Sequence, residues 1–420
     1  MPRATLSPTT PVTFAKLARA IEKQRKDIVK LEAGLTACNA VGPQNDGPGE
    51  AEKAKFLTGW LKENGFPAPK DYPAADKRVK GGKRPNLVCA IPGASKRKLW
   101  VFSHLDVVPP GERSLWTTDP FTVVEKGGKI FGRGVEDNQQ GMVSSIFAAK
   151  ALLEADVTPK DTICLSFVAD EETGSDYGIK HMLAKHKSLF AKDDLILVPD
   201  AGDRTGTKIE IAEKGMLWLR FTVEGKQCHA SMPYLGKNAM RAGSDLAVRL
   251  DQLYQLFPAS DELFDPKMST FEPTKREANV PNINTLPGFD VFCLDSRVLP
   301  PYPLDDVIAK VRALANDVER THGVKIAIDT VHREDAAPPT SAQAPVVREL
   351  AAAIEEVDGV KATPFGIGGG TVAALFRKAG FPAAVWSKQD ESAHSPNEYA
   401  IVDNLVHDAK VYCRMMTPNE

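Results

Sequence analysis

The sequence places a histidine and an aspartate directly after an apolar run. Residues 99–102 form the run, and Ser103-His104-Leu105-Asp106 follows it. A short apolar run of this kind predicts a buried strand, and residues two apart on a strand point the same way. A histidine that binds a metal usually donates its second ring N–H to a carboxylate. His104 is therefore a candidate metal ligand, and Asp106 is a candidate for that second contact.

Four further candidate ligands follow other strand-like runs or turns. They are Asp137 in Gly132-Arg133-Gly134-Val135-Glu136-Asp137, Glu172 in Asp170-Glu171-Glu172-Thr173-Gly174, Asp200 after Pro199, and His394 in Ala393-His394-Ser395-Pro396-Asn397-Glu398. With His104 they supply two imidazoles and three carboxylates, which suit zinc or a harder ion such as Mn²⁺. Two metals that share one carboxylate and lie about 3.5–4 Å apart need about this many ligands. The set predicts a dinuclear hydrolase.

Glu171 is a further carboxylate beside the candidate ligand Glu172. Adjacent residues of an extended segment face opposite ways, so Glu171 needs a local bend to approach the same water molecule. In that position it would accept the proton of the water and pass it to the leaving nitrogen, first as a general base and then as an acid.

Alternating strands and helices must position these residues. Strands are expected at 86–91, 99–102, 162–169 and 195–198, and helices at 14–35, 50–64 and 142–153. Carboxylates recur where the strands end, which is where open α/β sheets hold their sites. The pattern predicts an α/β fold with a mostly parallel sheet flanked by helices.

The middle of the chain has a different pattern, which predicts an inserted domain. Residues 216–223 alternate between apolar and polar types, helices are expected at 239–256 and 304–321, and strands at 290–295 and 325–330. Two strand–helix–strand units suggest a small α+β domain, one four-stranded sheet under two helices. After the proline-rich stretch 336–345, the elements expected at 346–357, 371–379 and 381–387 resume the first pattern. We expect a catalytic domain at 1–214 and 334–420, split by a domain at 215–333.

Composition excludes several classes of partner. The 420 residues carry 53 basic and 55 acidic side chains, and no basic block or long apolar run stands out, so neither nucleic acid nor a membrane is expected as a partner. The six cysteines are scattered without a CxxC pair, which argues against a disulfide framework and a thiolate metal site. The polar stretch 1–11 lacks the apolar core of a secretory signal, so a cytoplasmic location is expected.

Taken in order, the motifs resemble those of a known enzyme family. S-H-x-D at Ser103, G-R-G-x-x-D at Gly132, D-E-E-x-G at Asp170 and the late His394 are similar to those of zinc-dependent amidohydrolases and metallopeptidases. That family includes glutamate carboxypeptidase, peptidase T, carnosine dipeptidase, acetylornithine deacetylase and succinyl-diaminopimelate desuccinylase. The resemblance runs from about Asp27 to the C-terminus. It implies a split catalytic domain, an inserted ferredoxin-like lid through which a homodimer forms, and two Zn²⁺ ions per subunit, with Co²⁺ or Mn²⁺ as substitutes.

The resemblance also implies roles for the candidate residues. One metal would lie on His104 and Asp200, a second on Glu172 and His394, and Asp137 would bridge them. Asp106 would orient His104, and Glu171 would activate a water that bridges the metals. The peptide bond after Asp137 would be cis.

The same resemblance extends to the inserted domain and the turn after it. Cys228-His229-Ala230-Ser231-Met232-Pro233 and Gly236-Lys237-Asn238-Ala239 match a motif whose histidine, here His229, stabilises the carbonyl oxyanion, often across a dimer interface. Asn284 in N-x-x-P-G and Arg297 in D-x-R match residues that hold the substrate carboxylate. Gly370 and Thr371 end a glycine-rich turn before an expected helix, where a carboxylate can approach backbone N–H groups.

Three departures from the family pattern bear on the function, and three alternatives stand beside the main prediction. Gln139 stands where relatives usually have Lys, Val372 where they often have Asp or Ser, and Asp200 is more typical of the peptidases than of the deacylases. We predict a dinuclear amide hydrolase that acts on a dipeptide or short peptide with a free carboxylate. The nearest alternative is an N-acyl amino acid deacylase of the acetylornithine or succinyl-diaminopimelate type, and the next is a metal-binding relative that has lost catalysis. A serine or cysteine hydrolase is disfavoured, because there is no G-x-S-x-G motif and Cys228 beside His229 has poor geometry for a dyad.

Overall fold

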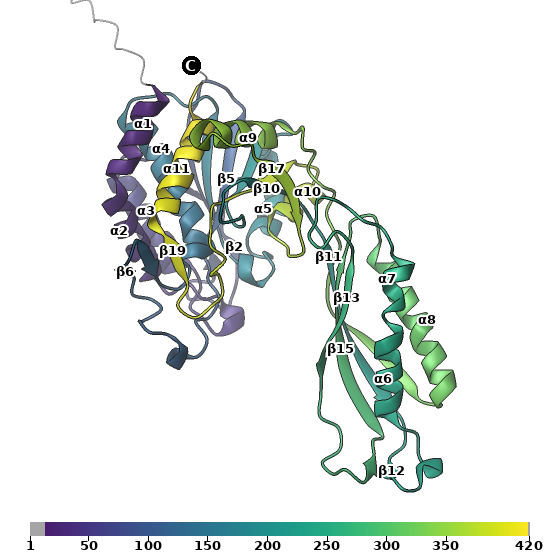
Figure 1. Cartoon of the computed structure of the whole chain (residues 1–420). Helices are drawn as coiled ribbons and strands as arrows, with labels where there is room; N and C mark the ends of the chain where they lie inside the picture. Colours follow the sequence, from purple (N-terminus) through teal and green to yellow (C-terminus); the bar gives the residue numbers. More distant parts are fainter. Residues whose placement is uncertain (1–12, 419–420) are drawn as a thin grey trace, which may run out of the picture. The chain divides into compact units, whose positions relative to one another are not determined.

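The computed structural model describes residues 13–418, which fold as two compact units (Figure 1). Of the described residues, the first unit comprises 13–211, Thr340–Pro364 and 371–418, and the second comprises Ala212–Pro339 and Phe365–Gly370. The polar stretch 1–11 lies outside the described residues. The two segments of the second unit thus lie in the sequence between the three stretches of the first.

An eight-stranded sheet forms the centre of the first unit, in the order β1-β4-β8-β5-β9-β18-β10-β17. Its middle strands are parallel and run as β8 (Thr162–Val168), β5 (Lys98–His104), β9 (Leu195–Val198) and β18 (Ala383–Val385). β4 (Leu87–Ile91) and β10 (Lys208–Glu213) flank them antiparallel, and β1 (Lys70–Asp71) and β17 (Thr363–Ile367) form the edges. The middle strands are buried on both faces, which explains their unbroken apolar runs. The predicted α/β class is confirmed.

Helices cover both faces of this sheet. On one face α4 (Gly141–Glu154) packs against α11 (Val402–Met416), which also contacts α9 (Pro345–Asp358). On the other, α5 (Ile179–Lys185) and α10 (Ala373–Lys378) share a core with Trp100 and Phe102 of β5. α3 spans Ala51–Glu63.

The remaining strands of the first unit are short. β2 (Ala74–Ala75) pairs with β3 (Lys83–Arg84), and β19 (Tyr399–Ile401), β7 (Lys129–Phe131) and β6 (Val124–Lys126) form a three-stranded sheet.

Two helices expected to be continuous are interrupted. The stretch 14–35 forms α1 (Phe14–Lys23) and α2 (Arg25–Thr36), and 239–256 forms α6 (Ala239–Arg249) and α7 (Gln252–Leu256). Both halves of each pair still bury apolar residues, among them Ile21, Ile28, Leu246 and Leu253. Because the apolar spacing continues across each break, periodicity alone does not reveal it.

The second unit is a four-stranded antiparallel sheet with helices on one face. The strand order is β13 (Thr270–Arg276), β15 (Phe289–Val298), β11 (Gly215–Glu224) and β16 (Lys325–Glu334). Alternate side chains of β11, among them Leu217 and Phe221, are buried. They pack in a core that includes Leu246 of α6 and Val311 of α8 (Leu304–His322). β12 (Cys228–His229) and β14 (Thr285–Leu286) pair separately.

The segment Phe365–Gly370 belongs to the second unit, although the sequence placed it in the catalytic domain. Hydrogen bonds account for the difference, because Gly366 N donates to Leu263 O at 2.6 Å and Lys214 N donates to Ile367 O at 3.0 Å. These contacts join residues far apart in the chain, which a local pattern does not reveal.

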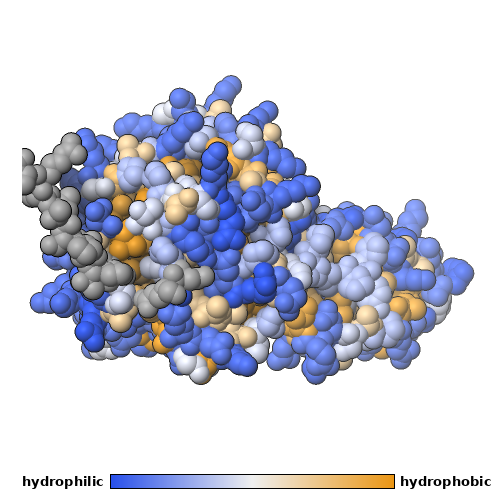
Figure 2. Space-filling model, turned by 90° about the horizontal axis from the view of Figure 1, so that it is seen from above, coloured by the Kyte–Doolittle hydropathy of each residue, from blue (hydrophilic) through white to orange (hydrophobic). Residues whose placement is uncertain are grey.

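The surface seen from above is mainly hydrophilic, with hydrophobic residues in scattered groups (Figure 2). Within residues 13–418, no helix is both long enough and apolar enough to cross a lipid bilayer.

Candidate metal centre

His104 is the last residue of β5, and its ring is held by the turn that follows. The side chain is 1% exposed, and Nδ1 lies 2.9 Å from the main-chain carbonyl oxygen of Asp106. The nearer carboxylate oxygen of Asp106 is 3.7 Å away, so the orienting contact comes from the Asp106 carbonyl. A carbonyl only accepts, so Nδ1 carries the proton and Nε2 faces the site with its lone pair available.

The turn after β8 brings Glu171 and Glu172 close to His104 at the end of β5. Asp170 adopts a left-handed conformation (φ 68°) and a 3₁₀ turn follows over Glu171–Thr173, which supplies the bend that Glu171 needs. The Asp106 carboxylate accepts the backbone N–H groups of Glu171 and Glu172, each at 3.1 Å. The ends of β5 and β8 are thereby fixed to each other.

Asp137 lies between the two histidines. Its Oδ1 is 2.8 Å from Nε2 of His104, and its Oδ2 is 3.0 Å from Nε2 of His394. The Asp137–Asn138 peptide is cis, as predicted. The two oxygens of one carboxylate thus face two different imidazoles.

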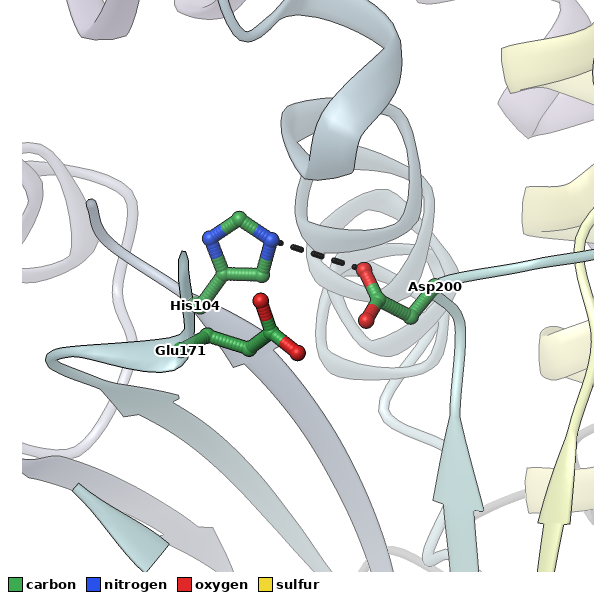
Figure 3. A group of neighbouring side chains, drawn as sticks. All are labelled: His104, Glu171 and Asp200. Atoms are coloured by element: carbon green, nitrogen blue, oxygen red, sulfur yellow. Dashed lines mark ion pairs between the residues drawn. The ribbon is translucent and has the colours of Figure 1, made fainter. Parts of the chain in front are cut away.

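Glu172 and Asp200 complete the two halves of the site. Glu172 Oε2 is 3.1 Å from Nε2 of His394, and Asp200 Oδ1 is 3.4 Å from Nε2 of His104. Figure 3 shows His104 and Asp200 facing each other, with the carboxylate of Glu171 beside both. All the residues predicted as metal ligands, together with Glu171 and Asp106, therefore lie together in the first unit.

The electrostatics of the site reflect an excess of carboxylates. Burial, followed by the charge of Asp200, raises the pKa of Glu171 well above its usual range. Burial and then the charge of Asp137 raise the pKa of Glu172. Hydrogen bonds to Asp137 and Glu172 raise the pKa of His394 to about 10. Four carboxylates around two imidazoles create a negative potential that bound cations would offset.

The residues present fit divalent cations. Donor atoms of His104, Glu171 and Asp200 lie within 4.8 Å of one another, as do those of His104, Asp137 and Glu172. The second carboxylate oxygen of Glu172, Oε1, is buried and has no hydrogen-bond partner in the part of the chain that the structure describes. Imidazole and carboxylate donors are those that Zn²⁺ and related ions take in proteins.

Two residues that support the site were not singled out from the sequence. Glu398 is fully buried and accepts the N–H groups of Gly134, Glu136 and Asp137 at 3.0, 3.0 and 3.1 Å. Asn138 donates Nδ2–H to Asp200 at 2.8 Å and accepts the N–H of His104 at 3.1 Å. In the sequence, the available signals were a glutamate four residues after His394 and a polar residue directly after Asp137.

The predicted oxyanion and carboxylate-binding residues lie mainly in the second unit. His229 is exposed on β12, opposite Thr285 of β14, and Ala230 N donates to Asn284 O at 2.9 Å. Arg297 on β15 contacts Asp295 at 2.8 Å and Gly368 O at 2.7 Å.

The last two predicted substrate contacts follow β17. Gly370 ends the segment Phe365–Gly370 of the second unit. Thr371 opens the next stretch of the first unit, and its hydroxyl accepts the N–H of Ala373 at 3.1 Å.

Comparison with known proteins supports this description. Residues 100–417 match the profile of peptidase family M20/M25/M40. A protein of Methanocaldococcus jannaschii named as an uncharacterized metallohydrolase is 39% identical over 93% of this chain and 99% of its own length. Succinyl-diaminopimelate desuccinylase of Paracoccus denitrificans is 26% identical over 93% of this chain and 97% of its own length. The crystal structure of aminopeptidase PepT from Bacillus cereus shares the fold, with a TM-score of 0.74 at 19% identity, covering 93% of this chain and 98% of that one.

Proposed function

Because the chain belongs to peptidase family M20/M25/M40 and is a hydrolase, we propose that it hydrolyses an amide bond at a dinuclear metal centre. The observation that carries the proposal is the position of Asp137, whose two oxygens lie 2.8 and 3.0 Å from the imidazoles of His104 and His394. A carboxylate in this position suits a bridge between two cations.

The assignment of ligands follows the same contacts. His104 and Asp200 would hold one ion, Glu172 and His394 the other, and Asp137 both, as their mutual distances of 3.4 and 3.1 Å support. Zn²⁺ suits this donor set, and Mn²⁺ or Co²⁺ are substitutes. Bound there, the cations would polarise the scissile carbonyl and increase the acidity of a water between them.

The chain itself supplies the proton transfers. Glu171 belongs to the group with His104 and Asp200, and its raised pKa suits a carboxylate that takes a proton and gives it back. It would accept the proton of the attacking water and donate it to the leaving nitrogen. Asp106 keeps the backbone of Glu171 in place through the N–H bond at 3.1 Å.

A dipeptide or short peptide with a free carboxylate is the proposed substrate, with Asn284, Arg297, Gly370 and Thr371 as proposed carboxylate contacts. Asp200, where the deacylases more typically have Glu, supports this choice. An N-acyl amino acid deacylase is the second candidate, because a desuccinylase is 26% identical over nearly the full length of both chains.

A substrate panel with the Zn²⁺-loaded protein separates these candidates. Dipeptides and tripeptides are compared with N-acetyl- and N-succinyl-amino acids, and free amino groups are measured. Faster hydrolysis of peptides supports the first candidate, and release of acetate or succinate alone supports the second. No hydrolysis of any amide with both metals bound would indicate a relative that has lost catalysis.

We also propose that the second unit forms a homodimer. Its apolar side chains Met232, Tyr234, Leu235, Met240 and Ile283 are between 40% and 102% exposed. Apolar residues gathered in this way commonly mark a protein interface. Light scattering tests this proposal. The double variant Tyr234→Asp with Ile283→Asp should halve the molar mass, whereas Val360→Asp in the first unit should leave it unchanged.

A cytoplasmic location of the protein stays a prediction.

A further inference from the structure

A basic hollow lies in the first unit, away from the metal centre. Its volume is about 510 Å³, and four cationic side chains line it, namely Arg97, Lys160, Arg348 and Arg414. Arg97 comes directly before β5, whereas His104 is the last residue of that strand. At about 3.3 Å per residue, β5 separates the hollow from the metal centre by roughly 20 Å.

Two helices build the wall of the hollow. Arg348, Ala352 and Glu356 lie one turn apart on α9, and Arg414 and Met415 come from the last turns of α11. Alanine at 352 and 353 leaves room between the longer side chains, because neither extends beyond its Cβ atom. The volume falls in the range of small-molecule sites and exceeds what a single simple ion fills.

The acidic residues of the hollow only partly compensate its basic ones. Glu349 is shared between Arg97 at 3.0 Å and Lys160 at 2.5 Å, and Glu356 pairs with Arg414 at 2.5 Å. Asp161 also pairs with Arg97, at 2.6 Å. Three carboxylates thus compensate four cations, and the hollow keeps a net positive charge of one.

Arg348 is the cation most available to a ligand. Its side chain is exposed and lines the hollow, and it makes no hydrogen bond or ion pair with another residue of 13–418. Arg97, by contrast, is already oriented by Asp161 at 2.6 Å and by Glu349. A free guanidinium beside pre-oriented cations is an arrangement that suits bidentate binding of an oxyanion.

We propose that this hollow binds a small organic anion through its phosphate or carboxylate groups, with Arg348 as the principal contact. The net positive charge of the hollow favours an anion, and the volume admits a body attached to the charged group. The proposed site is independent of the amide hydrolysis, because no residue of it belongs to the metal centre.

Calorimetric titration of the Zn²⁺-loaded protein tests the proposal with two probes, adenosine monophosphate and succinate. Their comparison distinguishes a phosphate from a dicarboxylate ligand. We expect Arg348→Glu to weaken binding of the preferred probe at least tenfold. Lys192→Glu is the matched control, since it reverses the charge of another exposed residue outside the hollow. It should leave the affinity within about twofold.

Two results would overturn the proposal. One is that neither probe binds the wild-type protein, and the other is that binding is equal in the wild-type protein and both variants, which would place the anion elsewhere, for example at the metals. Thermal unfolding and peptide hydrolysis should be unchanged in both variants. If Arg348→Glu folds poorly, Arg348→Gln replaces it in the test. This variant removes the charge without reversing it, so its affinity for the probe should lie between those expected for the wild-type protein and for Arg348→Glu.

Discussion

The backbone N–H of Ser231 donates a hydrogen bond to Nδ1 of His229 at 3.2 Å, and the Ser231 hydroxyl lies 2.7 Å from the same nitrogen. A backbone N–H can only donate, so Nδ1 acts as the acceptor and the neutral ring carries its proton on Nε2. That tautomer is the one a histidine needs to donate to a developing oxyanion.

Replacing His229 should therefore reduce catalysis without affecting the metals. We expect His229→Ala to lower kcat by about 10²–10³-fold, the usual effect of losing an oxyanion donor, while the zinc content stays the same. Ser231→Ala keeps the backbone N–H and should cost much less. His322→Ala is a control in the same unit, because His322 pairs with Asp245 at 2.9 Å. A kcat unchanged in His229→Ala would contradict the role.

Glu171→Gln should abolish proton transfer and preserve the site. The amide has almost the same shape but accepts no proton, so we expect kcat to fall by about 10²–10⁴-fold. Bound zinc is measured by elemental analysis alongside the rate, and the assignment predicts two ions per chain in both proteins. Substantial turnover by the variant would show that another group is the base.

Asp137→Ala and His394→Ala should differ in how much metal they lose. Asp137 faces both imidazoles, whereas His394 contacts only Asp137 and Glu172 among the site residues. At micromolar free zinc, we expect His394→Ala to retain close to one zinc ion per chain. Under the same conditions, Asp137→Ala should retain neither of the two ions. Equal metal content in the two variants would argue against a bridging carboxylate.

Glu398→Gln should destabilise the first unit. The buried carboxylate accepts three backbone N–H groups and the guanidinium of Arg133 at 2.6 Å, and the amide of Gln would direct N–H groups at these donors. Leaving a buried charge unpaired costs roughly 3–5 kcal/mol. Denaturant unfolding measures the loss, and Glu355→Gln on the exposed side of α9 should change stability by no more than about 0.5 kcal/mol.

Stability should depend on pH through His407. Burial lowers the pKa of this residue, but hydrogen bonds and charges from Asp408 and Asp358 outweigh burial, so the pKa is raised above 6.5. His407 contacts Asp358 at 2.7 Å and Asp408 at 3.2 Å, which links α11 to the end of α9. Its stabilisation is complete below the unfolded pKa and is lost as the pH rises through the folded pKa.

Comparison with His407→Gln tests this dependence. The difference in free energy of unfolding between the wild-type protein and the variant should be largest below about pH 6.5, the usual pKa of His, and should shrink on the alkaline side. A difference that grows with pH would contradict the raised pKa. Chemical unfolding at a series of pH values provides the measurement.

The candidate ligands could be recognised from the sequence because local features mark them. His104 and Asp200 follow apolar runs that form β5 and β9, and Asp137 follows a glycine-rich turn. The alternation of β11 likewise predicted a half-buried strand of a second sheet. Such features depend on neighbours a few residues away, so the chain displays them without a fold.

Contacts between distant segments were decided by the tertiary structure alone. Glu398 accepts the backbone N–H of Asp137, and the two oxygens of Asp137 face two different histidines. Arg348 and Arg97 line one hollow because Glu349 of α9 pairs with Arg97. The sequence by itself thus determined which residue types stand at strand ends and turns, and hence the class of chemistry. Which atoms meet was settled by packing, since the free energy of a long-range contact depends on the whole core that brings its two segments together.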